Sequence, residues 1–127
     1  MKNYYKLIGS TEENFNKTIE CIEEEIATIK VLLTTDYFDE NAEPSEIIRS
    51  LDESLKRFND YLIDINVLFT TATYNTLALQ NKEDYEFTNI EMFAELLITE
   101  ISYKNNAYCD IYEKYKEIID EIKKSLQ

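Results

Sequence analysis

Apolar residues recur along three stretches of the chain at alternating spacings of three and four positions. In the first stretch the series comprises Phe15, Ile19, Ile22, Ile26, Ile29 and Leu33. A second series runs from Ile48 to Ala72 and includes Leu55 and Phe58, and a third runs from Ile90 to Ile122 and includes Ile111 and Ile118. We expect these positions to be buried together with Ile22 and Ile26. Such spacing places one apolar stripe along an α-helix, and over many turns it is typical of coiled-coil-like packing. The pattern therefore predicts three long amphipathic helices.

Local signals indicate where these helices begin. Ser10 and Glu13 fit a capping box, in which a hydroxyl and a carboxylate satisfy free backbone amides at a helix start. Thr88 and Glu91 repeat that arrangement before the third stretch, and Pro44 suits the first turn of the second helix. The expected helices cover about residues 10–37, 43–80 and 88–126.

The fold class follows from the shortness of the connections. Short connections force neighbouring helices to run antiparallel. One Gly and one Pro in 127 residues argue against a β-sheet protein, which needs repeated turns. We therefore predict an all-α chain, a single domain over residues 1–127 folded as an antiparallel three-helix bundle with coiled-coil-like heptad packing. The run from Thr70 to Thr73 leaves open whether the second helix is continuous, because β-branched residues are poor helix formers.

The predicted helix lengths leave one end of the bundle uncovered. Matching the helices level by level places Ile26 beside Ser54. The first helix then starts level with Leu68 of the second helix, and the other two helices extend roughly 18 Å beyond that level. Within this overhang, residues 65–81 carry no charge. The apolar hairpin end is the expected surface for self-association or docking, comprising Phe69, Tyr74, Leu77, Ile90, Phe93 and Leu97.

Three covers for this apolar end stay open. Residues 1–8 could fold over it, with Gly9 acting as a hinge. A second copy of the chain could pack on it to give a homodimer, or a different protein could dock there.

The net charge limits the partners. The chain has 26 acidic and 13 basic residues and no His, which gives a formal charge of −13. This sign argues against direct binding to nucleic acid or to an anionic membrane. No apolar run exceeds three residues, so we expect no membrane span.

The acidic residues are concentrated in one part of the chain. Residues 12–64 hold 15 acids and 5 bases, whereas residues 104–124 hold five of each. Helical spacing aligns acids on the first two helices, and we call this set the acidic surface: Glu13, Glu20, Glu24, Glu46, Glu53, Asp60 and Asp64. Its composition resembles that of small inhibitors that block restriction or CRISPR enzymes by mimicking DNA. The alternative is a solvated face that keeps the protein soluble.

The sequence offers no recognisable catalytic site. Without His, neither a histidine-dependent triad nor the Glu-x-x-His pairs of ferritin-like di-iron sites can form. One Gly is too few for a phosphate-binding loop. The segment Asp39–Pro44 has Pro where a calcium loop requires Gly, so we interpret it as a solvated acidic loop. We expect no catalytic residue, no cofactor and no metal, and hence a non-enzyme.

Cysteine and tyrosine side chains leave further alternatives open. Cys21 and Cys109 project to a similar level, but two cysteines without a secretory signal favour free thiols in a reducing cytoplasm. Tyr108, Tyr112 and Tyr115 share one helix face and suit either an interface or the edge of the core.

These features predict a cytoplasmic, non-catalytic binding protein. The favoured function is an inhibitor that docks on the basic, nucleic-acid-binding surface of a larger protein. Frequent Asn, Lys and Ile fit an AT-rich genome, which favours a phage or mobile-element source. The alternatives are a homo-oligomeric assembly protein that uses its apolar end, and an immunity protein or chaperone that shields a cargo.

Overall fold

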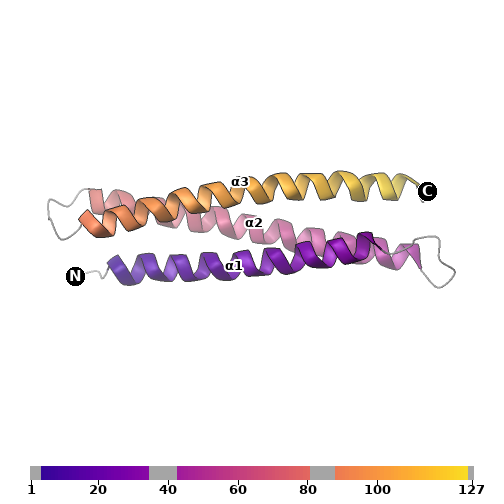
Figure 1. The fold of residues 1–127 in the computed structure, drawn as a ribbon, viewed down its shortest axis with the longest axis horizontal. Helices are drawn as coiled ribbons and strands as arrows, with labels where there is room; N and C mark the ends of the chain where they lie inside the picture. Colours follow the sequence, from indigo (N-terminus) through magenta and orange to yellow (C-terminus); the bar gives the residue numbers. More distant parts are fainter. Residues whose placement is uncertain (1–3, 35–42, 81–87, 126–127) are drawn as a thin grey trace.

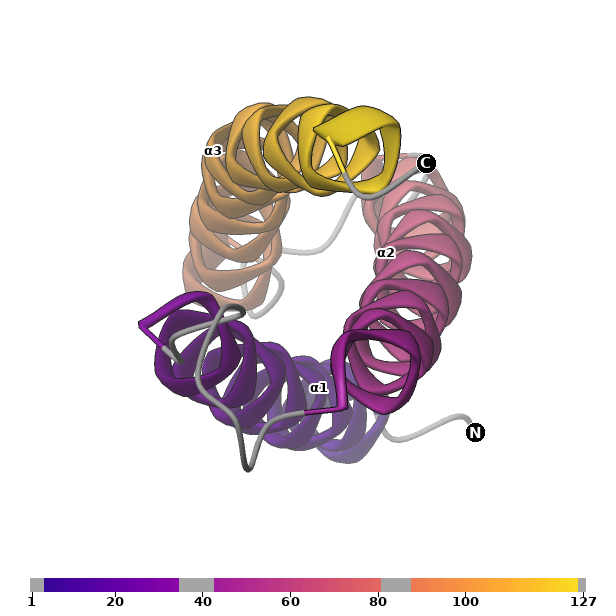
Figure 2. The same ribbon diagram turned by 90° about the vertical axis from the view of Figure 1, so that its right-hand side faces the viewer.

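The computed structural model describes residues 4–34, 43–80 and 88–125, and almost all of them are helical. The helices are α1 (Tyr4–Leu33), α2 (Pro44–Gln80) and α3 (Thr88–Ser125). They lie side by side as long rods, each antiparallel to the one before it (Figure 1). Viewed from the end, the three helices surround a common axis (Figure 2), and α2 packs extensively on both neighbours. The predicted all-α three-helix bundle is confirmed.

The start of α1 differs from the prediction. The helix begins at Tyr4, so Ser10 lies inside it and does not cap its first turn. Ile8, Thr11 and Phe15 are all buried, which continues the apolar spacing toward the N-terminus. Burial of this extra turn favours the longer helix over a cap at Ser10. At the other end α1 stops at Leu33, and residues 35–37 of the expected helix lie outside the described residues.

The longer α1 largely removes the expected overhang. The first turns of α1 lie beside the end of α2 and the start of α3 (Figure 1). Gly9 is helical, with no positive φ, so it is not a hinge. Part of the expected cover therefore comes from α1 itself, as a helical extension that buries Ile8. Residues 1–3 lie outside the described residues.

The threonine run does not interrupt α2, which continues to Gln80. Each hydroxyl donates to the backbone carbonyl four residues earlier, with Oγ1–O distances of 3.1 Å for Thr70, 3.1 Å for Thr71 and 2.8 Å for Thr73. These bonds satisfy the hydroxyls locally without displacing the helical amide bonds. Propensity costs of about 0.5 kcal/mol per residue are offset by packing along the rest of the helix.

The core follows the predicted apolar series with a local correction. The residues of the first two helices expected to be buried together are indeed buried: Ile22, Ile26, Leu55 and Phe58. In α3 the expected positions Ile111 and Ile118 are only half-buried, whereas Ile119 is fully buried. An α-helix has 3.6 residues per turn, so a strict heptad drifts off the core face over many turns. The drift accounts for the shift from Ile118 to Ile119.

Contacts between helices fix their register. The Ser54 hydroxyl of α2 donates to Glu25 of α1 at 3.3 Å, which agrees with the expected level of Ile26 and Ser54. The rings of Phe58 and Tyr112 meet edge to face, with centroids 5.5 Å apart. Tyr112 therefore contributes to the edge of the core rather than to a free surface.

Candidate interaction surfaces

The four α2 members of the acidic surface are all exposed. Glu46, Glu53, Asp60 and Asp64 follow one another at helical spacing on the outward side of the helix. No ion pair joins any of them to a base within the described part of the chain. The exposed basic residues Arg49 and Lys56 lie between these acids in the sequence. The stripe is therefore acidic overall but also carries positive charges.

The three α1 members, Glu13, Glu20 and Glu24, are exposed as well. Glu13 pairs with Lys17 one turn later, at 3.3 Å from Oε1 to Nζ. Such an exposed pair leaves both charges hydrated and contributes little to stability. The acidic surface therefore lies on two helices that pack against each other, α1 and α2.

The C-terminal part of α3 contains equal numbers of acidic and basic residues, five of each over residues 104–124. Lys123 Nζ lies 2.7 Å from Asp52 Oδ1, an ion pair between α3 and α2. The last turns of α3 thus neutralise part of the negative charge of α2. The acidic excess is therefore largest over residues 12–64, which hold 15 acids and 5 bases.

A buried carboxylate that the sequence analysis did not single out lies between α1 and α2. Glu25 is buried, and its two oxygens accept hydrogen bonds from Arg57 Nε at 2.7 and 3.1 Å. Ser54, which is fully buried, donates to the same carboxylate. The hydrogen bond to Glu25 raises the pKa of Arg57, although desolvation opposes this. The sequence signal was the predicted match in level between Ile26 and Ser54, which places Glu25 and Ser54 close together.

Tyrosine hydroxyls make two further polar contacts in the bundle. Tyr108 of α3 is buried and donates to the Glu23 carboxylate of α1. Burial, reinforced by this carboxylate, raises the pKa of Tyr108 to about 12. Burial likewise raises the pKa of Tyr61, and a hydrogen bond with Cys21 adds to the shift. These contacts link helices, and within α3 Tyr108 belongs to the core while Tyr112 and Tyr115 pack against its edge.

The apolar end is only partly the surface that was expected. Ile90 and Leu97 are buried and Phe93 is half-buried against the core, so these α3 residues do not form a docking surface. The α2 members of the expected surface, Phe69, Tyr74 and Leu77, are exposed.

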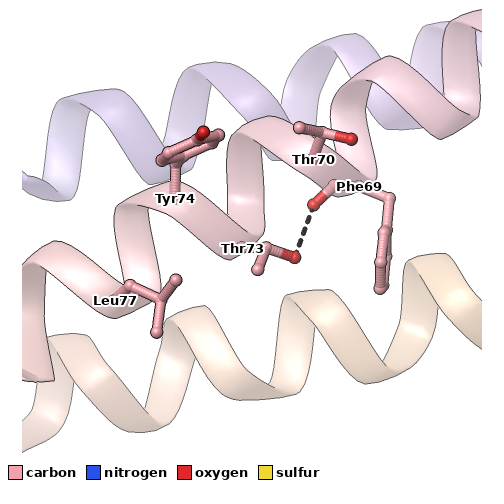
Figure 3. A pocket seen from close by; sticks show the side chains of 5 residues that line it. All are labelled: Phe69, Thr70, Thr73, Tyr74 and Leu77. Carbon is pink, nitrogen blue, oxygen red and sulfur yellow. Dashed lines mark hydrogen bonds between the residues drawn. The ribbon is translucent and has the colours of Figure 1, made fainter.

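Phe69, Thr70, Thr73, Tyr74 and Leu77 line a shallow recess on α2 (Figure 3). Figure 3 shows Tyr74 pointing away from α3, while Phe69 and Leu77 lean toward it. The recess presents mainly carbon, since the Thr73 hydroxyl is bonded to the carbonyl of Phe69. It is an apolar surface feature without acid–base groups.

Few of the described side chains are placed to act as a nucleophile or to bind a metal ion. Cys21 and Cys109 are both half-buried free thiols. Burial raises the pKa of Cys109, reinforced by Asp110 and Glu113, so this thiol is poorly suited to act as a nucleophile. The described side chains include no group of three or more His, Cys, Asp or Glu residues placed to hold a metal ion. The acidic segment at Asp39 lies outside the described residues.

Comparisons with known proteins give no relative. No protein-family model, no curated protein and no solved structure matches this chain. Among the described helices, none is long and apolar enough to cross a membrane.

Proposed function

We propose that this protein is a non-catalytic inhibitor that docks its acidic surface on a basic, nucleic-acid-binding surface of a larger protein. The observation that carries the proposal is the uneven charge: residues 12–64 hold 15 acids and 5 bases on a chain of formal charge −13. All seven members of the acidic surface are exposed and available to a partner.

Rigid helices suit this kind of recognition. The carboxylates stand where a partner would otherwise find phosphates, and long helices hold them in place before binding. From Glu46 to Asp64 the stripe extends for about 27 Å along α2. Complementary fields accelerate association and weaken with salt, so each charge contributes mainly to the association rate.

The setting that fits this function is the cytoplasm of a cell that hosts a phage or mobile element. The two free cysteines, Cys21 and Cys109, support a reducing compartment. A second candidate function, a homo-oligomeric assembly protein, is supported by the exposed Tyr74 and Leu77.

The test uses two charge-reversed variants with the same total charge. In the first, the four α2 acids of the acidic surface become Lys: Glu46→Lys, Glu53→Lys, Asp60→Lys and Asp64→Lys. In the control, four exposed α3 acids become Lys: Asp110→Lys, Glu113→Lys, Glu117→Lys and Glu121→Lys. Both variants move the formal charge from −13 to −5 and leave the core unchanged.

Capture from a lysate of the encoding organism, quantified by mass spectrometry, identifies the partner for wild type and both variants. We expect the α2 variant to lose the partner and the α3 control to retain it, with weaker binding at high salt. Wild-type protein should then displace labelled nucleic acid from the purified partner. Equal binding by the α2 variant at low and high salt, or no displacement, would contradict the proposal.

A further inference from the structure

The outward face of α2 changes character half-way along the helix. One row of exposed positions, at spacings of three and four, runs along the side opposite the core. Its first half is charged: Glu46, Arg49, Glu53, Lys56 and Asp60. Its second half, which we call the outer seam, has no charge: Ile63, Val67, Thr70, Tyr74 and Leu77. Charged residues are common at exposed helix positions. A continuous row of exposed residues without charge is unusual and often marks a contact surface.

The outer seam is separate from the core of the bundle. The core of the same part of α2 is formed by other positions, including Leu62, Ile65, Ala72 and Leu79. Spacings of four, three, four and three are those with which a helix packs against a partner helix. The second half of α2 thus carries two apolar faces, of which the bundle uses one.

We propose that the outer seam binds the outer seam of a second copy of this chain, with the two α2 helices antiparallel about a two-fold axis near Thr70. In this arrangement Ile63 of one copy lies near Leu77 of the other. A row of apolar residues with a small side chain at its centre is complementary to itself under such an axis. The shallow recess beside Tyr74 and Leu77 (Figure 3) would then receive a side chain from the other copy.

Charge favours a second copy at this position and in this orientation. Two chains of charge −13 repel each other, which favours a contact where carboxylates are absent. Residues 65–81 provide that uncharged stretch. An antiparallel arrangement also sends the charged first halves of the two α2 helices to opposite ends, whereas a parallel one would bring Asp60 and Asp64 of both copies together.

A similar row on α3 is less suitable. Met92, Leu96, Thr99 and Tyr103 are exposed at the same spacing and lie toward the same end of the bundle. However, Glu95 lines the recess beside this row, and an antiparallel contact centred on the row would bring it level with the exposed Glu100 of the other copy. The geometry therefore points to α2 rather than α3 as the contact between copies.

The proposed dimer is independent of the inhibitor function. The outer seam contains no member of the acidic surface, and the acids Glu46, Glu53 and Asp60 of each copy lie beyond its Ile63 end. A variant of the outer seam can thus lose dimerisation while the charge at these three positions is unchanged.

The first test compares matched substitutions on the two helices. The seam variant is Val67→Lys with Tyr74→Lys, and the control is Leu96→Lys with Tyr103→Lys. The replaced side chains have similar exposure, 60% and 71% on α2 against 67% and 72% on α3. Both variants move the charge from −13 to −11, which reduces general repulsion, so any loss of dimer is a local effect.

Sedimentation equilibrium over a wide concentration range measures the mass, and circular dichroism verifies that each variant is helical. We expect dimers for wild type and the α3 control, and a monomer for the seam variant. A monomeric wild type, a dimeric seam variant, or dissociation only in the α3 control would overturn the proposal.

A crosslink tests the axis directly. In a background with Cys21→Ser and Cys109→Ser, Thr70→Cys should form a symmetric disulfide-linked dimer under mild oxidation. Thr99→Cys, at the corresponding exposed position of α3, is the control and should stay monomeric. A crosslink at Thr99→Cys but not at Thr70→Cys would also overturn the arrangement.

Discussion

Replacing Arg57 by Met should expose the energetic role of the buried carboxylate between α1 and α2. The Glu25 side chain retains only 9% of its exposure, and Arg57 Nε lies 2.7 Å from its Oε2. Without Arg57, the carboxylate keeps the hydrogen bond from Ser54 but loses its only described ion-pair partner. Met preserves most of the packing of the Arg side chain, so the change isolates the charge.

The expected loss lies between two limits. Breaking a fully buried ion pair costs about 3–5 kcal/mol, whereas an exposed pair contributes about 0–1 kcal/mol. Arg57 is 49% exposed, so water can reach the carboxylate in the variant and lower the cost. We therefore expect Arg57→Met to reduce the free energy of unfolding by about 2 kcal/mol. Replacing both partners, Glu25→Leu with Arg57→Met, should be closer to wild type, because no buried charge is left unpaired.

Urea denaturation followed by far-ultraviolet circular dichroism measures these free energies. Arg49→Met is the matched control, since Arg49 is exposed on the same helix and should change stability by less than about 0.5 kcal/mol. The reasoning fails if Arg57→Met is as stable as Arg49→Met, or if the double variant is less stable than Arg57→Met alone.

Three further substitutions test the core and the interhelical contacts. Ile26→Asp should destabilise the protein by about 3 kcal/mol or more through an unpaired buried charge, whereas Ala27→Asp at an exposed site should change little in the same melting assay. The pKa of Tyr108 is about 12 in the folded protein against an ordinary 10.0, so its contribution is present below pH 10.0 and is lost as the pH rises toward 12. The free energy of unfolding of Tyr108→Phe, measured by urea denaturation at alkaline pH, should therefore fall less steeply over that range than that of wild type. Identical slopes would contradict the raised pKa of Tyr108. Thr76→Val removes a buried hydroxyl that is hydrogen-bonded to its own helix. It should change the free energy of unfolding by less than about 1 kcal/mol.

The fold could be predicted from the sequence because its main determinant is periodic. Apolar residues at spacings of three and four define each core face, and the same arithmetic sets the levels at which α1, α2 and α3 meet. The contact between Ser54 and Glu25 lies at the level that this arithmetic expects. The exposure of the acidic surface could also be predicted from the helical periodicity, because its members lie outside the apolar series.

Features that depend on competition between local signals were harder to predict. The capping box at Ser10 is a genuine local pattern, but burial of Ile8 and Thr11 outweighs it and extends α1 to Tyr4. That error created the expected overhang and assigned Ile90 to a docking surface, although it is a core residue. Pairing of Glu25 with Arg57 was missed because the heptad pattern describes apolar positions and ignores the polar neighbours beside them.

Gly9→Ala distinguishes the hinge that the sequence suggested from the continuous helix in the structure. Gly9 lies inside α1 without positive φ, and a Cβ added there would meet no atom within 4 Å. Alanine should therefore stabilise the protein by about 0.5–1 kcal/mol, since it lowers the backbone entropy of the unfolded chain and adds no clash. Urea denaturation of Gly9→Ala and Gly9→Pro measures the effect. Proline removes a helical amide and should cost about 3 kcal/mol in an interior turn. If both variants match the wild type, the first turns of α1 contribute nothing to folding, and Ile8 is not held in the core in solution.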